Sequence, residues 1–90
     1  FLPTEVSLSN AYPNPFNPIT MLSYDVPSEM TIHLGVYDVR GRLVDQLVND
    51  IRKQGQYDIT WNADAHSSGV YMIKMVAGST MKVQKVMLVK

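Results

Sequence analysis

Hydrophobic and polar residues alternate along most of this chain, which is the period-two pattern of half-buried β-strands. One alternating run covers residues 21–26 and stops at Pro27, which cannot donate to a strand ladder. Similar runs cover residues 32–37 and 56–61, and each is bounded by a turn that contains glycine. Since no window of about 11 residues carries an apolar stripe at helical spacing, the pattern predicts an all-β protein.

Other segments are less regular. Residues 43–48 are apolar at irregular spacing, so they fit a strand, a bulged strand or a single helical turn. Residues 62–69 are polar and predict a loop. In residues 70–76 apolar side chains occupy both phases, which predicts a central strand with both faces covered. A tight hairpin connection is expected at residues 77–79.

The last segment predicts an edge strand with an irregularity. Apolar residues of 81–83 and of 86–88 occupy opposite phases, and the change falls at Gln84 and Lys85. The simplest cause of a phase change inside a strand is a β-bulge. Lysines at this point, Lys85 and also Lys82, are typical of a strand edge that must not pair with other chains.

Together with a short lead strand near residues 6–8, these segments give about seven strands. Short strands at such spacings are typical of sandwiches, so we predict an immunoglobulin-like antiparallel β-sandwich. The chain of 90 residues has room for one core, and we expect one domain over residues 1–90. Because it opens at Phe1 and not at methionine, we expect a piece of a larger parent protein, with residues 1–7 as a linker or lead strand.

Composition narrows the classes of partner. Apolar residues make up 46% of the chain and charged residues 18%, as in ordinary globular domains. Eight basic and eight acidic side chains cancel, so no basic surface is available for nucleic acid and no nucleic-acid partner is expected. The chain has no cysteine for a disulfide or thiolate metal site. It also has no apolar run long enough for direct membrane insertion.

The chain offers little for catalysis. It has two histidines, with His33 expected on the outward phase of a strand and His66 in a loop. Asp64, Ser67 and Ser68 neighbour His66, but residues of one loop rarely reach triad geometry, which needs separate elements to converge. We therefore expect a solvated loop here and no enzyme.

No cofactor and no metal site is expected. Asp58, Asn62 and Asp64 lie close together in sequence but lack the glycine-centred ligand loop of calcium sites. Asp25 and Asp38 are instead predicted to accept hydrogen bonds from turn amides, which is the usual role of carboxylates beside tight turns.

Three prolines fall within residues 12–18, Tyr-Pro-Asn-Pro-Phe-Asn-Pro, and they exclude a helix there. The segment fits a rigid ligand for an aromatic groove. It also fits a stiff edge segment whose Phe16 or Tyr12 plugs one end of the sandwich, and we favour this second interpretation.

The single tryptophan has two interpretations. Trp61 could stack against a sugar ring, but it shares its phase with Tyr57 and Ile59, so a core position is favoured. The six methionines are scattered without helical spacing and are predicted to fill gaps in the core.

The order of these motifs along the chain is more specific than any motif alone. In sequence they are residues 12–18, 20–27, 36–42, 47–48, 68–71, 77–78 and 85–90, together with Gly55 and Trp61. This ordered set closely resembles the type IX secretion C-terminal sorting domain, type A, found at the end of proteins that Bacteroidetes and related bacteria export. The resemblance spans essentially residues 8–90. Two features depart from the family. Gly35 lies within a strand where the family usually has a residue with a side chain, and the loop at residues 62–68 is short.

The resemblance implies a sorting signal and not a catalyst. The parent would enter the periplasm by a separate N-terminal signal, and an outer-membrane secretion translocon would then recognise this domain. A sortase would remove the domain, with cleavage before or near Phe1, and leave the cargo secreted or attached to the cell surface. The implied partners are the translocon, the sortase and a covalently linked N-terminal cargo domain.

By the same resemblance, translocon recognition falls on Gly69, Val70, Tyr71, Lys85, Val86, Met87, Leu88, Val89 and Lys90. An edge strand at the C-terminus would offer unpaired backbone groups that a receptor can extend by β-augmentation. Alternatively, this strand only completes a sheet, and the parent's catalytic domain covers its outward side chains. A further alternative, from another class, is an accessory carbohydrate-binding or spacer module of a secreted glycan-active enzyme.

Overall fold

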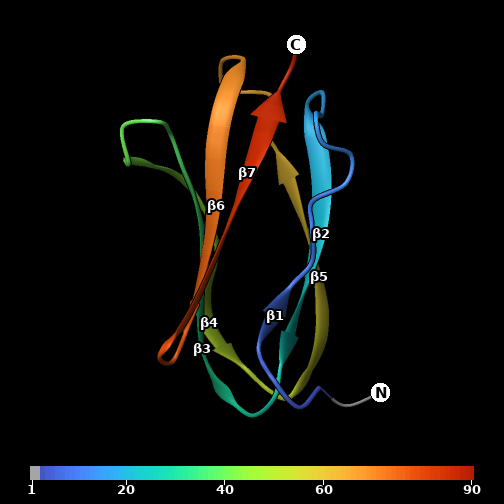
Figure 1. Cartoon of the computed structure of the whole chain (residues 1–90), viewed down its shortest axis with the longest axis vertical. Coiled ribbons are helices and arrows are strands. Elements are labelled where there is room, and N and C mark those ends of the chain that lie inside the picture. Colours follow the sequence, from blue (N-terminus) through green and yellow to red (C-terminus); the bar gives the residue numbers. More distant parts are fainter. Residues whose placement is uncertain (1–2) are drawn as a thin grey trace.

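The computed structural model describes residues 3–90, which fold into seven β-strands (Figure 1). The strands are β1 (Ser7–Leu8), β2 (Ile19–Val26), β3 (Met30–Tyr37), β4 (Leu43–Arg52), β5 (Gly55–Asn62), β6 (Gly69–Ala77) and β7 (Thr80–Leu88). They form two antiparallel sheets, with strand orders β1-β2-β5 and β4-β3-β6-β7. The predicted immunoglobulin-like β-sandwich is thus confirmed. Within the described residues, no helix is long and apolar enough to cross a bilayer.

The core lies between the inward faces of the two sheets. Each strand contributes the inward phase of its alternating pattern. The buried apolar side chains on strands are Leu22, Tyr24 and Val26 of β2, Ile32, Leu34 and Val36 of β3, Val48 of β4, Trp61 of β5, Tyr71, Ile73, Met75 and Ala77 of β6, and Val86 and Leu88 of β7. Because burying one large apolar side chain contributes roughly 1.5–3 kcal/mol, this interface supplies most of the cohesion of a chain without disulfides.

The irregular segment at residues 43–48 is part of a bulged strand. β4 pairs with β3 along its length, and the register shifts at two places, the first between Leu34 and Gly35. Gly35 suits this close approach because a Cβ atom there would lie 2.9 Å from Leu43 Cδ1. Gly35 therefore makes room for a side chain of β4.

β6 is central, as predicted, because β3 and β7 pair with its two edges. Its inward phase is buried, but its outward phase of Val70, Met72, Lys74 and Val76 is only half-buried. The expectation that both faces are covered is therefore wrong for residues 3–90. Side chains of adjacent strands shield the outward phase instead, as where the Lys74 ammonium lies 4.8 Å from the Tyr37 ring centroid.

β7 lies at an edge of its sheet, as predicted, but the bulge predicted at Gln84 and Lys85 is wrong. The pairing of β7 with β6 runs through all nine residues without a shift. The apparent phase change has another cause. Met81 and Val83 are apolar but point outward, with 60% and 47% of their surface exposed.

Gln84 explains why the inward phase of β7 is polar at its middle. Its side-chain Nε2 donates to the Ser9 carbonyl at 2.6 Å, and its Oε1 accepts from the Ala11 amide at 2.7 Å. The carboxamide of Gln84 therefore bonds to the segment after β1 as the backbone of a neighbouring strand would.

Asp38 organises the turn between β3 and β4, as predicted. Its Oδ1 accepts hydrogen bonds from the amides of Arg42 at 3.0 Å and Arg40 at 2.9 Å. These bonds, with the Arg42 amide as the largest cause, lower the pKa of the Asp38 carboxyl below its usual value. The matching prediction for Asp25 is wrong, since Asp25 accepts a hydrogen bond from the Ser7 hydroxyl at 2.5 Å.

We predict that Gln84→Ala lowers the free energy of unfolding by about 1–3 kcal/mol, because it leaves the Ser9 carbonyl and the Ala11 amide without this partner. Urea denaturation followed by Trp61 fluorescence measures the change. The matched control is Gln56→Ala at an exposed position of β5, which should cost less than about 0.5 kcal/mol. Equal losses for the two variants would contradict the role given to Gln84.

Candidate recognition site at the C-terminal end of the sandwich

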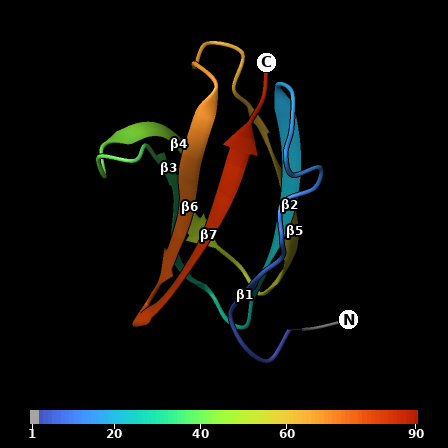
Figure 2. The same ribbon diagram turned by 45° about the horizontal axis from the view of Figure 1, so that its top comes forward.

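The proline-rich segment links the two sheets. Tyr12 bridges Met21 of β2 through two backbone hydrogen bonds of 2.8 and 3.0 Å. Four residues later the Phe16 amide donates to the Met87 carbonyl, and the Phe16 carbonyl accepts from the Val89 amide, both at 2.9 Å. This short segment therefore connects β2 to β7 along one side of the sandwich (Figure 2).

Asn14 extends this connection with its side chain. Its Nδ2 donates to the Lys85 carbonyl at 3.1 Å, and its Oδ1 accepts from the Met87 amide at 3.0 Å. A carboxamide carries a donor and an acceptor side by side, as the peptide groups of a strand do. Asn14 thus pairs with β7 although Pro13 and Pro15 on either side have no amide to donate.

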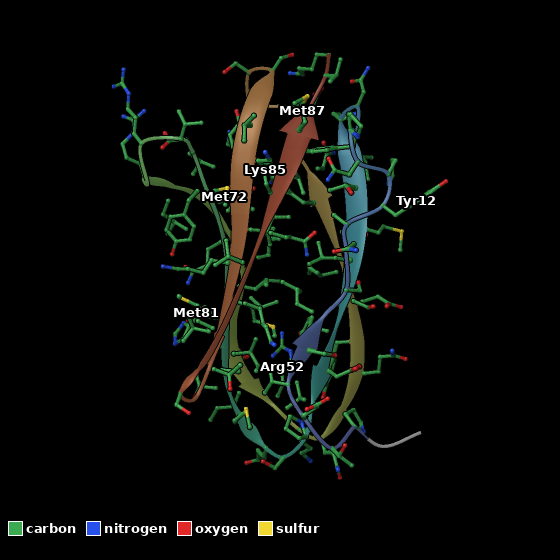
Figure 3. The ribbon with its side chains drawn as sticks, viewed as in Figure 1. Tyr12, Arg52, Met72, Met81, Lys85 and Met87 are labelled. Atoms are coloured by element: carbon green, nitrogen blue, oxygen red, sulfur yellow. The ribbon has the colours of Figure 1, made fainter. Side chains whose placement is uncertain are left out.

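Phe16 is the aromatic plug predicted for this end, and Tyr12 is not. Phe16 is 2% exposed, and its ring centroid lies 5.4 Å from that of Trp61. Tyr12 is 71% exposed and projects away from the sandwich (Figure 3). Tyr71 also packs edge-on against Trp61 at 5.4 Å. Such tilted aromatic pairs contribute about 0.5–1.5 kcal/mol each beyond the burial of their area.

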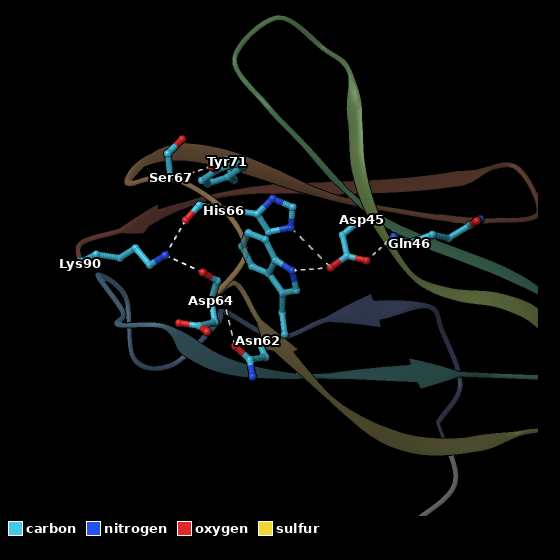
Figure 4. Close-up of polar contacts among 9 residues, drawn as sticks. Asp45, Gln46, Asn62, Asp64, His66, Ser67, Tyr71 and Lys90 are labelled. Atoms are coloured by element: carbon cyan, nitrogen blue, oxygen red, sulfur yellow. Dashed lines mark hydrogen bonds and ion pairs between the residues drawn. The ribbon is translucent and has the colours of Figure 1, made fainter.

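Trp61 is a core residue, as predicted, with 1% of its surface exposed. Its Nε1 donates to Asp45 Oδ2 at 2.9 Å, and the same oxygen lies 3.8 Å from His66 Nε2 (Figure 4). Asp45 of β4 thereby satisfies the buried indole and holds His66 beside it. Because a buried ring cannot stack on a sugar, Trp61 gives no support to the carbohydrate-binding alternative.

Tyr71 forms a tyrosine corner, a feature of immunoglobulin-like sandwiches. Its hydroxyl donates to the carbonyl of Ser67, four residues earlier, at 2.6 Å. This bond fixes the loop that leads into β6, where Gly69 has a φ of 152° that side chains disfavour. The Gly-Val-Tyr motif therefore has a structural role at this corner.

Lys90 fastens the end of the described chain to the same loop. Its Nζ donates to the carbonyls of Asp64 at 2.6 Å and His66 at 2.9 Å (Figure 4). Its backbone amide donates to the Ser68 hydroxyl at 3.0 Å. The loop, the start of β6 and the end of β7 are therefore held as one unit.

The loop does not assemble the sequence motif that resembles a triad. Within residues 3–90, His66 pairs with Asp45 and not with Asp64, and no hydrogen bond joins a serine to His66. Asn62 Oδ1 accepts from the Asp64 amide at 3.0 Å. No three histidine, aspartate or glutamate side chains in this range are grouped as metal ligands. His33 is exposed on β3, as predicted.

The structure brings the two predicted recognition segments side by side. Gly69, Val70 and Tyr71 pair with Leu88, Met87 and Val86, respectively. Three of the nine predicted residues, Tyr71, Val86 and Leu88, are buried in the core. The six others are exposed or half-buried, and we call them the exposed recognition set: Gly69, Val70, Lys85, Met87, Val89 and Lys90.

The backbone edge of β7 is open only in part, which corrects the expectation of unpaired groups at the extreme C-terminus. In an antiparallel pair, successive residues direct their backbone groups alternately toward and away from the partner strand. The hydrogen bonds from Asn14 and Phe16 show that residues 85, 87 and 89 direct their backbone amides and carbonyls away from β6. At this end, the carbonyl of Lys85, both groups of Met87 and the amide of Val89 are occupied.

Sequence reasoning missed three residues that hold this end together: Asn14, Gln84 and Asp45. Each bonds to a group remote in sequence, as Asn14 does to Lys85 across 71 residues. One local signal could have indicated Asn14. Where prolines remove backbone donors beside a strand edge, a carboxamide between them is the remaining group that can pair with it.

Residues 10–90 match the family described as the secretion system C-terminal sorting domain. The match includes every strand except β1, and it covers Asn14, Phe16, Asp45, Trp61, Tyr71 and Lys90 at this end of the sandwich. No curated protein and no solved structure matches the chain.

We predict that Asn14→Ala lowers the free energy of unfolding by about 1–2 kcal/mol, because it removes both hydrogen bonds to β7. Hydrogen exchange of the Met87 amide should become faster in the same variant. Asn17→Ala is the matched control, since Asn17 is exposed and also precedes a proline. Unchanged exchange at Met87 in Asn14→Ala would contradict the pairing described here.

Proposed function

This chain belongs to the family of type IX secretion C-terminal sorting domains, and we propose that it carries an N-terminally linked cargo protein across the outer membrane. A sorting-signal role follows from the family. We further propose its partners, the export route and the residues that the translocon recognises.

The observation that carries the proposal is the convergence of the family's motifs at one end of the molecule. The proline-rich segment, the start of β6 and the end of β7 are far apart in sequence, yet backbone pairing joins them. They present the exposed recognition set on one continuous structure. A receptor that binds this end recognises a folded arrangement of residues and not a linear sequence motif.

The position of the chain ends supports the same route. Pro3 lies at the turn between β4 and β5, where the Gln54 Nε2 donates to its carbonyl at 3.2 Å. Lys90 lies at the opposite end of the long axis, which extends 37 Å (Figure 1). Cargo that precedes Pro3 therefore leaves the recognition end free for a translocon.

The proposed route begins in the periplasm and ends with cargo that is secreted or attached to the cell surface. The outer-membrane translocon and a sortase are the proposed partners. The cleavage expected before or near Phe1 lies outside the described residues. The role of the sortase is to separate the cargo from the domain after export.

We predict that a periplasmic reporter fused before residue 1 is exported by a bacterium that has this secretion system. The double substitution Met87→Glu and Val89→Glu should reduce the exported fraction by about tenfold, because it puts charge into an apolar part of the exposed recognition set. Exported and periplasmic fractions are measured by immunoblotting. Retention of the unsubstituted fusion in the periplasm would contradict the proposed function.

The matched control lies away from the recognition end. Ile51→Glu changes a side chain of similar exposure on β4, and export should persist. Outward positions are preferable to a deletion of residues 86–90, since Val86 and Leu88 are buried and their loss would unfold the domain. Thermal unfolding of each variant shows whether the fold is retained.

A further inference from the structure

In the lower half of the β7 edge, the outward backbone groups from Met81 to the Lys85 amide have no hydrogen-bond partner within residues 3–90. We propose that this open edge binds an extended peptide segment of a partner protein, in which apolar and acidic residues alternate. The inference deepens and rests on the proposed function, because the peptide would belong to the secretion machinery.

The open edge is defined by its backbone groups. The alternation that directs residues 85, 87 and 89 away from β6 also directs residues 81 and 83 away from it. None of the hydrogen bonds formed within residues 3–90 reaches the outward amides and carbonyls of Met81 and Val83, or the amide of Lys85. These five groups match the backbone of one added strand, which is how β-augmentation gains affinity.

The fold itself keeps this half open. The segment of residues 9–16 runs along β7, and at the upper end it bonds to the β7 backbone. Beside Gln84, the only bonds between this segment and β7 come from the glutamine side chain. Before residue 9 the chain pairs elsewhere, because Ser7 and Leu8 of β1 pair with β2 of the other sheet. No described segment can therefore cover residues 81–83 while β1 is in place.

The side chains beside the open edge favour apolar residues on one face of the incoming strand. Met81 is exposed on the same strand as Met87 (Figure 3). Val83 shares the outward phase of Met81 and is also exposed. Val83 also lines a hollow of about 430 Å³ whose wall includes Met72, Lys74 and Tyr37. An apolar side chain of the incoming strand would pack against Val83 at the rim of this hollow, which gives the edge a means of selecting its ligand.

The charges beside the open edge favour acidic residues on the other face. Lys82 shares the inward face of its sheet with Met75, its partner across the strand pair, and it is exposed at the rim. Within the described chain, no carboxylate lies within 4.0 Å of the ammonium groups of Lys82 or Lys85. Since opposite charges on paired strands stabilise a sheet, glutamate or aspartate is the favoured residue opposite Lys82.

The same lysines disfavour a second copy of this chain as the ligand. Pairing two β7 edges would gather Lys82 and Lys85 of both copies at one seam, and like charges on adjacent strands destabilise it. An acidic strand from another protein removes this repulsion. The lysines therefore select against self-association while admitting the proposed ligand.

The test uses amide hydrogen exchange of the 90-residue chain with two synthetic peptides. The probe is Thr-Val-Glu-Val-Glu-Val-Thr, and the control is Thr-Val-Lys-Val-Lys-Val-Thr. The glutamate peptide should slow exchange of the Met81 and Val83 amides by about tenfold at low salt, and less at 1 M salt. The lysine peptide should leave both rates unchanged.

Substitutions at Val83 separate backbone pairing from side-chain contact. Val83→Pro removes an amide that the fold does not use and should abolish protection of Met81 by the glutamate peptide. Val83→Ala keeps the amide and should retain most of the protection. Equal effects of the two peptides, the absence of any effect, or protection that rises with chain concentration alone would overturn the inference.

Export separates this inference from the proposed function. If the unsubstituted fusion is exported and Val83→Pro is retained in the periplasm as a folded protein, both stand. If Val83→Pro is exported as well as Val83→Ala, the open edge has no role in secretion, the inference is wrong, and the proposed function stands. If the unsubstituted fusion is not exported, the proposed function fails, and so does the part of the inference that depends on it.

Discussion

The pairing of the proline-rich segment with the edge of β7 is the interaction on which the rest of this domain depends. The two sheets otherwise meet mainly through their apolar faces, with one hydrogen bond from Trp61 of β5 to Asp45 of β4, in a chain without disulfides. Asn14 and Phe16 bond one sheet's connecting segment to the other sheet's last strand. Together with Gln84, Asn14 and Phe16 join the two sheets by hydrogen bonds along one side of the sandwich, and they fix the position of the C-terminal residues.

This arrangement gives the same motifs two roles. Tyr71, Val86 and Leu88 build the core and its corner, so their loss would disturb any receptor contact indirectly through the fold. The exposed recognition set can meet a receptor without unfolding. The family pattern at the C-terminus is thus partly a folding requirement, and the proposed recognition is left to its outward residues.

Most of the fold could be predicted from periodicity because alternation directly reports a face buried against another sheet. The failures have a common cause. Met81 and Val83 are apolar but outward, and Gln84 is polar but inward, so the local pattern falsely indicated a bulge. The partners of Gln84 and Asn14 lie more than 70 residues away, and no local rule finds them. The nine recognition residues were predicted from the resemblance to the family. The structure shows that three of them are buried and six are exposed or half-buried, a division that periodicity alone could not predict.

The opposite placement of Pro3 and Lys90 has a mechanical consequence. A pull applied between Pro3 and Lys90 acts along the strands, so the ladder between β6 and β7 is loaded in shear. All its bonds then share the force, whereas a sideways pull would peel them one at a time. The whole hairpin of β6 and β7 therefore resists tension between these two residues.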